Sequence, residues 1–141
     1  AACSQTLYAL RKSHGMPSKA IHAIFEATVV AKLSYASPAW WGFSTAADKD
    51  RLEAFLRRSS RFGYRLNNAQ TLSSICDAAD DKLFQRIILN NQHLLYNLLP
   101  PKRNLTHNLR QRAHDFQLPN KLSKLFESNF IIRMLYKSIS V

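Results

Sequence analysis

The sequence predicts an all-α protein, a bundle of five to six helices with no sheet. Three observations support this fold class. Several segments place apolar residues at helical spacing, no segment alternates apolar and polar residues as a half-buried strand does, and the chain has only 3 glycines and 5 prolines. With 141 residues, of which 46% are hydrophobic, the chain is long enough to bury a core. We therefore expect helices that pack on one another.

We assign residues 1–66 to a first, three-helix unit. Residues 4–13 are expected to be the end of its first helix, which His14 and Gly15 close. Pro17 is expected in the first turn of the second helix, which extends to about Ala36. This second helix carries apolar residues around nearly its whole circumference, a pattern typical of a helix in the middle of a bundle.

An apolar corner, Pro-Ala-Trp-Trp-Gly-Phe, lies at residues 38–43 between the second and third helices. Proline cannot continue a helix and glycine adopts backbone angles that other residues avoid, so the chain is expected to reverse here. Trp40 and Trp41 can either stack on unpaired nucleic-acid bases or enter the core. Because the whole corner is apolar, we expect at least one of the two rings to be buried.

The third helix is expected to begin after Ser44 or Thr45 as its N-cap, with Asp48 in its first turn, and to end at Gly63. Its apolar face consists of Leu52, Phe55, Leu56, Ser59 and Phe62.

The opposite side of this third helix is basic. At about 100° per residue, Arg57 and Arg61 point nearly away from the apolar face. They are flanked by Arg51, Arg58 and Arg65. Guanidinium groups match phosphate oxygens in a planar, two-pronged geometry, so such a row can follow a nucleic-acid backbone. We predict that these five arginines bind nucleic acid; the alternative is an ordinary solvated helix face.

Residues 67–141 are assigned to a C-terminal helical segment that begins with a polar break at residues 67–70. Thr71 is expected to cap a short helix, and Asp80 is expected to start a long amphipathic helix that the Pro-Pro pair at 100–101 ends. The remaining expected elements are a basic loop over residues 102–120 and a last helix over residues 121–138.

The sequence offers no catalytic or metal-binding pattern. Many polymerases hold their metal ions with an aspartate pair that follows an aromatic residue between strands, whereas Asp80 and Asp81 follow two alanines. We interpret these two carboxylates as favourable charges in a first helical turn. The five histidines and the isolated Cys3 and Cys76 are not spaced for zinc, and the histidines are expected on the surface or at caps. We predict a chain that is not an enzyme by itself and holds no cofactor or metal ion.

The chain carries a net charge of +11 and has a pI near 10.1. Such a balance indicates an acidic partner, with nucleic acid first and an anionic membrane surface second. No apolar run reaches the roughly 18 to 20 residues that a membrane span needs, and no signal peptide is evident. Two isolated thiols fit a reduced, intracellular setting. The chain begins Ala-Ala-Cys within a helical pattern, so we expect it to be part of a longer protein.

Six segments carry a family resemblance: LYALRKSHGM, LSYASPAWWGF, ADKDRLEAFLRRSSRFGY, DDKLFQRIILNNQHLLYNLLPP, NLRQRAHDFQLP and SNFIIRMLYKS. They are distributed over nearly the whole chain, from residue 7 to residue 138. The sequence resembles the C-terminal region of reverse transcriptases from non-LTR retrotransposons, in particular the jockey-like elements of animals. The most specific part is the Pro-Ala-Trp-Trp-Gly corner followed by Arg-Leu-Glu-Ala-Phe-Leu-Arg-Arg.

The resemblance implies that residues up to about 65 correspond to the helical thumb, which rests on the primer-template duplex, and that later residues form the post-thumb segment. The Mg²⁺-binding palm is not in this chain. The implied function is a non-catalytic part of an RNA-directed DNA polymerase that binds RNA–DNA or DNA duplex without sequence preference. The implied partners also include the upstream palm and fingers, in a nuclear or cytoplasmic ribonucleoprotein.

Two other interpretations stay open. The chain is either a helical protein-interaction or scaffold module that docks on the palm, with its basic charge incidental, or a degenerate transposon remnant without function. Phosphate binding weakens steeply with salt and docking of apolar surfaces does not, so a salt series separates the first of these from the nucleic-acid hypothesis.

Overall fold

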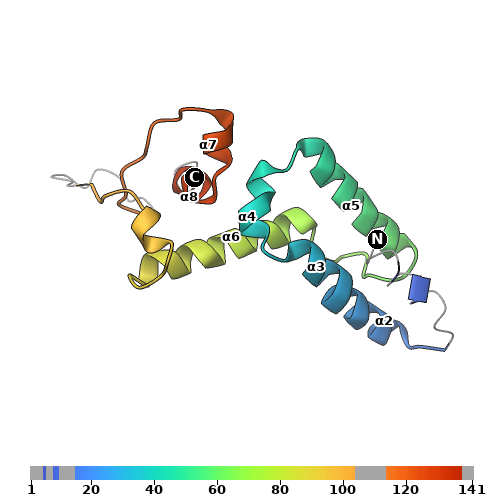
Figure 1. Cartoon of the computed structure of the whole chain (residues 1–141). Coiled ribbons are helices and arrows are strands. Elements are labelled where there is room, and N and C mark those ends of the chain that lie inside the picture. The colour runs from blue at the N-terminus through green and yellow to red at the C-terminus, as the bar shows by residue number, and fades with distance from the viewer. Residues whose placement is uncertain (1–4, 6–7, 10–14, 104–113, 138–141) are drawn as a thin grey trace. The chain divides into compact units, whose positions relative to one another are not determined.

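The structure, a computed structural model, describes residue 5 and residues 8–9, 15–103 and 114–137. The described residues are helical apart from turns and loops (Figure 1). Their only β-type pairing is one isolated antiparallel bridge between Lys102 and Phe116. The prediction of an all-α fold is therefore confirmed. The expected helix over residues 4–13 lies largely outside the described residues, and so does the middle of the expected basic loop.

Contacts divide the described chain into two compact units. The first combines the residues up to Ser37 with Ser44–Cys76, and the second combines Pro38–Phe43 with the residues from Asp77 onward. This grouping differs from the sequence-based division after residue 66. It places the apolar corner in the second unit, and its boundary between Cys76 and Asp77 falls inside the helix Leu72–Leu89.

The first unit begins with α2 (Ser18–Phe25), which continues through a short π-helix, η1 (Glu26–Val30), into α3 (Ala31–Ser34). Pro17 is the N-cap of α2 and so precedes the first turn. The buried side chains of this segment are Phe25, Val29 and Val30. The expectation of burial all round is wrong, because much of the apolar circumference is alanine, which loses little by exposure to water.

The main helix of the first unit is α5 (Ala46–Arg61). Thr45 is its N-cap, and the Thr45 hydroxyl accepts a hydrogen bond from the N–H of Asp48 at 3.1 Å, as predicted. Gly63 follows the helix with a φ of +79°, the left-handed conformation that glycine adopts without strain.

The apolar corner is a pair of short helices, α4 (Ser37–Trp40) and the 3-10 helix η2 (Trp41–Phe43). Pro38 is tolerated in α4 because it lies in the first turn, where its missing N–H has no helical partner to lose. Gly42 lies where a Cβ atom would overlap the carbonyl oxygen of Ser128, so only glycine permits this approach of the corner to the C-terminal helices.

One helix, α6 (Leu72–Leu89), replaces the two helices expected after Thr71. The Thr71 hydroxyl accepts a hydrogen bond from the N–H of Ser74 at 3.1 Å, as expected of a cap. Asp80, however, lies in the middle of α6. The helix ends at Leu89, well before the Pro-Pro pair. Directly after it, the Asn90 side chain accepts a hydrogen bond from the N–H of Gln92 at 3.0 Å. The 3-10 helix η3 (Tyr96–Leu98) follows.

The expected last helix is two helices, α7 (Lys124–Ser128) and α8 (Phe130–Lys137). They are separated at Asn129, whose side-chain oxygen accepts the N–H of Ile131 at 3.1 Å. Such a side chain competes with the helical backbone for hydrogen bonds, and this competition interrupts the predicted helix.

The core of the second unit combines α6, the segment after residue 113 and α8, and consists of Phe84, Ile87, Phe116, Ile131, Met134 and Leu135. His114 lies beside it and is buried, contrary to the expectation of a surface or capping histidine. Its Nδ1 accepts the N–H of Phe116 at 3.2 Å, so the ring proton is on Nε2, which donates to the carbonyl of Leu135 at 2.9 Å. Within the described ranges, no helix combines the length and the apolar character needed to cross a bilayer.

Candidate nucleic-acid interface

The helix α5 packs on the first unit along one side. Leu56 and Ser59 are buried on its inner side, with 1% and 3% of their surface exposed. The Glu53 carboxylate accepts the N–H of Ser73 at 2.9 Å, which ties α5 to the first turn of α6. These contacts orient α5 so that its opposite side faces solvent.

We define the arginine ridge as Arg51, Arg57, Arg58 and Arg61, all of which are exposed on α5. On an α-helix with 3.6 residues per turn, these four positions fall within an arc of about 120°, roughly opposite the buried residues. Arg57 and Arg61 are one turn apart, which places their Cα atoms about 6 Å apart along the axis.

The charges on α5 are segregated along its length. Its acidic residues, Asp48, Asp50 and Glu53, all lie in the N-terminal half. Arg51 pairs weakly with Asp48 at 3.8 Å. Arg57, Arg58 and Arg61 lie in the C-terminal half, and none of the described residues forms a hydrogen bond or an ion pair with their guanidinium groups. These three arginines are therefore available to an anion.

Arg65 does not belong to the ridge, and its prediction as a phosphate-binding residue is corrected. Its side chain is 5% exposed, and its Nε donates to the Glu26 carboxylate at 2.7 Å. A second donor, Nη2, bonds the carbonyl of Gln70 at 2.8 Å. Arg65 follows the turn at Gly63, so its direction no longer obeys the helical periodicity on which the prediction depended.

The two tryptophans pack on each other and have different exposures. Trp41 is buried at 5% exposure and Trp40 is partly buried, with ring centroids 5.6 Å apart in an edge-to-face arrangement. The expectation that at least one ring is buried is confirmed. Trp41 is buried in the second unit, so its ring is not accessible for base stacking.

Phe62 was assigned to the apolar face of α5, and this assignment is wrong, because 72% of the residue is exposed. Phe62 is the C-cap of α5, at the end of the ridge. The signal in the sequence was Gly63: a residue directly before a C-terminal glycine lies where the helix ends, and its side chain need not follow the buried side.

The predicted carboxylate pair is engaged by cations and lies in the middle of α6. Arg133 contacts Asp80 at 2.9 Å and Lys137 contacts Asp81 at 2.8 Å. Burial raises the pKa of Asp80 above its ordinary value of 3.8, and the nearby Arg133 opposes this rise. The interpretation of this pair as first-turn charges is wrong. In the part of the chain that the structure describes, no three acidic, histidine or cysteine side chains gather as a metal site.

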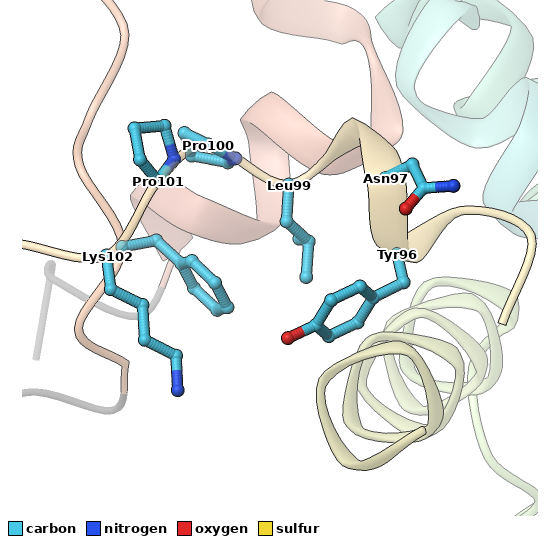
Figure 2. Close-up of a pocket in the computed structure, with 7 residues that line it drawn as sticks. Tyr96, Asn97, Leu99, Pro100, Pro101 and Lys102 are labelled. Carbon is cyan, nitrogen blue, oxygen red and sulfur yellow. The ribbon is translucent and has the colours of Figure 1, made fainter. Parts of the chain in front are cut away.

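A pocket of about 290 Å³ lies in the second unit after α6. Figure 2 shows Leu99 and the Tyr96 ring beside the same space, with Lys102 at its edge. Its other lining residues are Asn97, Pro100, Pro101 and Phe116. Lys102 is the only charged group in this lining, which combines it with apolar and uncharged polar side chains.

No protein-family model matches the chain, and neither a curated protein nor a solved structure matches it. The functional assignment therefore depends on the residues of the chain itself.

Proposed function

We propose that this chain binds nucleic-acid backbones through the arginine ridge of α5 without catalysing a reaction by itself. This role is the one expected of the thumb and post-thumb region of a non-LTR retrotransposon reverse transcriptase. The observation that carries the proposal is the set of three exposed arginines, Arg57, Arg58 and Arg61, with no acidic partner among the described residues.

The energetics of the helix support a bound anion. Like charges at i,i+4, as at Arg57 and Arg61, destabilise a helix by about 0.2–0.5 kcal/mol per pair. The helix dipole offsets part of this repulsion, because Arg58 and Arg61 lie in the last turn. A row of phosphates would relieve the remainder and would accept the paired donors of each guanidinium group. Phosphates are common to all sequences, so the binding is sequence-independent.

The test is the affinity for a labelled RNA–DNA hybrid across a salt series. In B-DNA each phosphate contact contributes about −0.9 to the slope of log affinity against log salt, and this value serves as the guide for the hybrid. The ridge variant Arg57→Gln/Arg58→Gln/Arg61→Gln should therefore show a slope shallower by about two to three units, with weaker binding at low salt.

A matched control removes the same number of charges elsewhere. Lys82, Arg86 and Lys124 are exposed and lie outside the ridge. The variant Lys82→Gln/Arg86→Gln/Lys124→Gln should keep most of the wild-type slope. Equal losses in the two variants would mean that net charge and not the ridge binds the hybrid, and the proposal would fail.

A second candidate function is docking on another protein, which for this resemblance is the palm domain. It is favoured by leucines of the second unit that are unusually exposed, with Leu89 at 81%, Leu94 at 91% and Leu98 at 64%. The three leucines lie within ten residues of sequence, and exposed apolar residues that form one patch commonly mark an interaction surface.

A further inference from the structure

Phe62 places an aromatic ring at the C-terminal end of the arginine ridge. It lies four residues after Arg58 and directly after Arg61. Side chains at i and i+4 are neighbours on a helix, with about 5–6 Å between their Cβ atoms. Phe62 is the C-cap, and its N–H still bonds the carbonyl of Arg58 at 3.1 Å, so the exposed residue lies within one turn of two exposed arginines.

The ring is supported by an aromatic series that begins in the core of the first unit. Phe25 is fully buried, and the ring of Tyr64 lies nearly parallel to it at a centroid distance of 6.5 Å. Phe62 in turn packs on Tyr64 at 6.4 Å with a tilt of 48°. Phe62 is thus in contact with Tyr64 while most of the residue faces solvent.

The turn that carries Phe62 is fixed by hydrogen bonds. The N–H of Gly63 bonds the carbonyl of Ser60 at 2.9 Å, and the N–H of Tyr64 bonds the carbonyl of Ser59 at 3.0 Å. The carbonyl of Gly63 is 3.1 Å from Nε2 of His22 on α2. A ring on such a turn loses little conformational entropy when a ligand binds.

We propose that Phe62 is a base-stacking platform and that the preferred ligand of the ridge is a nucleic-acid strand with unpaired bases. This inference rests on the proposed function and narrows its ligand class. An unpaired nucleotide presents an anionic phosphate beside a flat π surface, and Arg58, Arg61 and Phe62 present the complementary groups. In a continuous duplex the base faces cover one another, so only single strands and strand ends offer a free face.

The test compares two single strands at one salt concentration, a labelled oligothymidine and an abasic strand of the same length. Both carry the same phosphates, and only the first carries bases. Stacking of one base should make the wild type bind oligothymidine about 5- to 150-fold more tightly than the abasic strand. Phe62→Ala should bind the two strands equally, whereas Phe62→Trp should keep the preference.

Two further variants separate the possible outcomes. Leu122→Ala removes another exposed apolar residue, 78% exposed and in the second unit, and should keep the wild-type preference. Arg57→Gln/Arg58→Gln/Arg61→Gln should lose affinity for both strands. If Phe62→Ala keeps the preference for bases, or if the wild type has none, the stacking inference is overturned while the ridge stands. If the arginine variant binds both strands as the wild type does, the proposed function itself fails.

Discussion

Burial gives Asp80 a different role from the one that its position in the sequence suggested. Only 2% of the residue is exposed, and one of its two carboxylate oxygens has no hydrogen-bond partner among the described residues. The other oxygen is 2.9 Å from Arg133. Removing a carboxylate from water disfavours its charged form, and this effect of burial outweighs the attraction of Arg133 and raises the pKa of Asp80.

The raised pKa predicts how stability changes with pH. The folded state binds the Asp80 proton more tightly than the unfolded state, so the stabilising effect is fully present below the ordinary pKa of 3.8 and is lost as the pH rises through the raised pKa. We expect the wild type to lose free energy of unfolding relative to Asp80→Asn across this interval. Urea unfolding of both proteins over a pH series measures the difference, in which other carboxylates cancel. A wild type that gains stability relative to the variant would mean that the ion pair with Arg133 outweighs burial.

Arg61 and Arg65 are the same residue type but differ in burial and therefore in role. Both were expected on one ridge. Arg61 ends α5 and is exposed, whereas Arg65 lies beyond the turn and is buried against Glu26. Only the Arg65 side chain of this pair is buried, and losing Glu26 would leave that buried charge without its carboxylate, so the role of Arg65 is in stability and not in phosphate binding.

At the scale of elements, two asparagines decided the helix boundaries that periodicity missed. The apolar spacing continued past residues 90 and 129, but Asn90 and Asn129 turn their side chains onto nearby N–H groups and interrupt the helix. Hydrophobic spacing indicates which residues prefer the core, but it contains no information about side chains that compete for backbone hydrogen bonds. The signal was in the sequence, as polar residues at both positions, but it was weaker than the periodicity.

The approach of η2 to α7 gives a prediction with a definite sign. Gly42 has no left-handed φ, so replacing it with alanine would ordinarily be neutral or stabilise by about 0.4–1 kcal/mol. Here the added Cβ would overlap the Ser128 carbonyl oxygen and lie 2.9 Å from the Arg133 guanidinium. We expect Gly42→Ala to destabilise the protein by about 1–3 kcal/mol in urea unfolding. A neutral or stabilising result would show that this contact does not form.

At the scale of the whole molecule, positive charge and exposed leucine compete as explanations of function. The net charge of +11 arises from 20 basic and 9 acidic residues and favours nucleic acid. The exposed leucines favour a protein partner. These two features occur in different units: the ridge belongs to the first, and the leucines after α6 belong to the second.

The docking alternative has its own test. If the leucines bind the palm domain of a jockey-like reverse transcriptase, Leu94→Glu/Leu98→Glu should weaken the association about tenfold or more, since two apolar anchors are each replaced by a charge. Pull-down titration with the purified palm domain at low and high salt measures this. The ridge variant serves as the control and should bind the palm normally. Docking through these leucines would be excluded if high salt abolished the association and the leucine variant still bound the palm domain at low salt.

The sequence by itself determined the features that depend on neighbouring residues. Helical content, the Thr45 cap, the glycine stop at residue 63 and the basic outer side of α5 all follow from periodicity and local hydrogen bonding, which act over a few residues. The nucleic-acid proposal depends mainly on this local information.

Only the tertiary structure decided which of these residues are available. Glu26 reaches Arg65 across 39 positions and removes it from the ridge, and Tyr64 on buried Phe25 supports an exposed Phe62. Contacts at such separation depend on how helices pack, and periodicity within one helix contains no information about its neighbours. The sequence therefore identified the charged side of α5, and packing selected the arginines and the aromatic ring that face solvent.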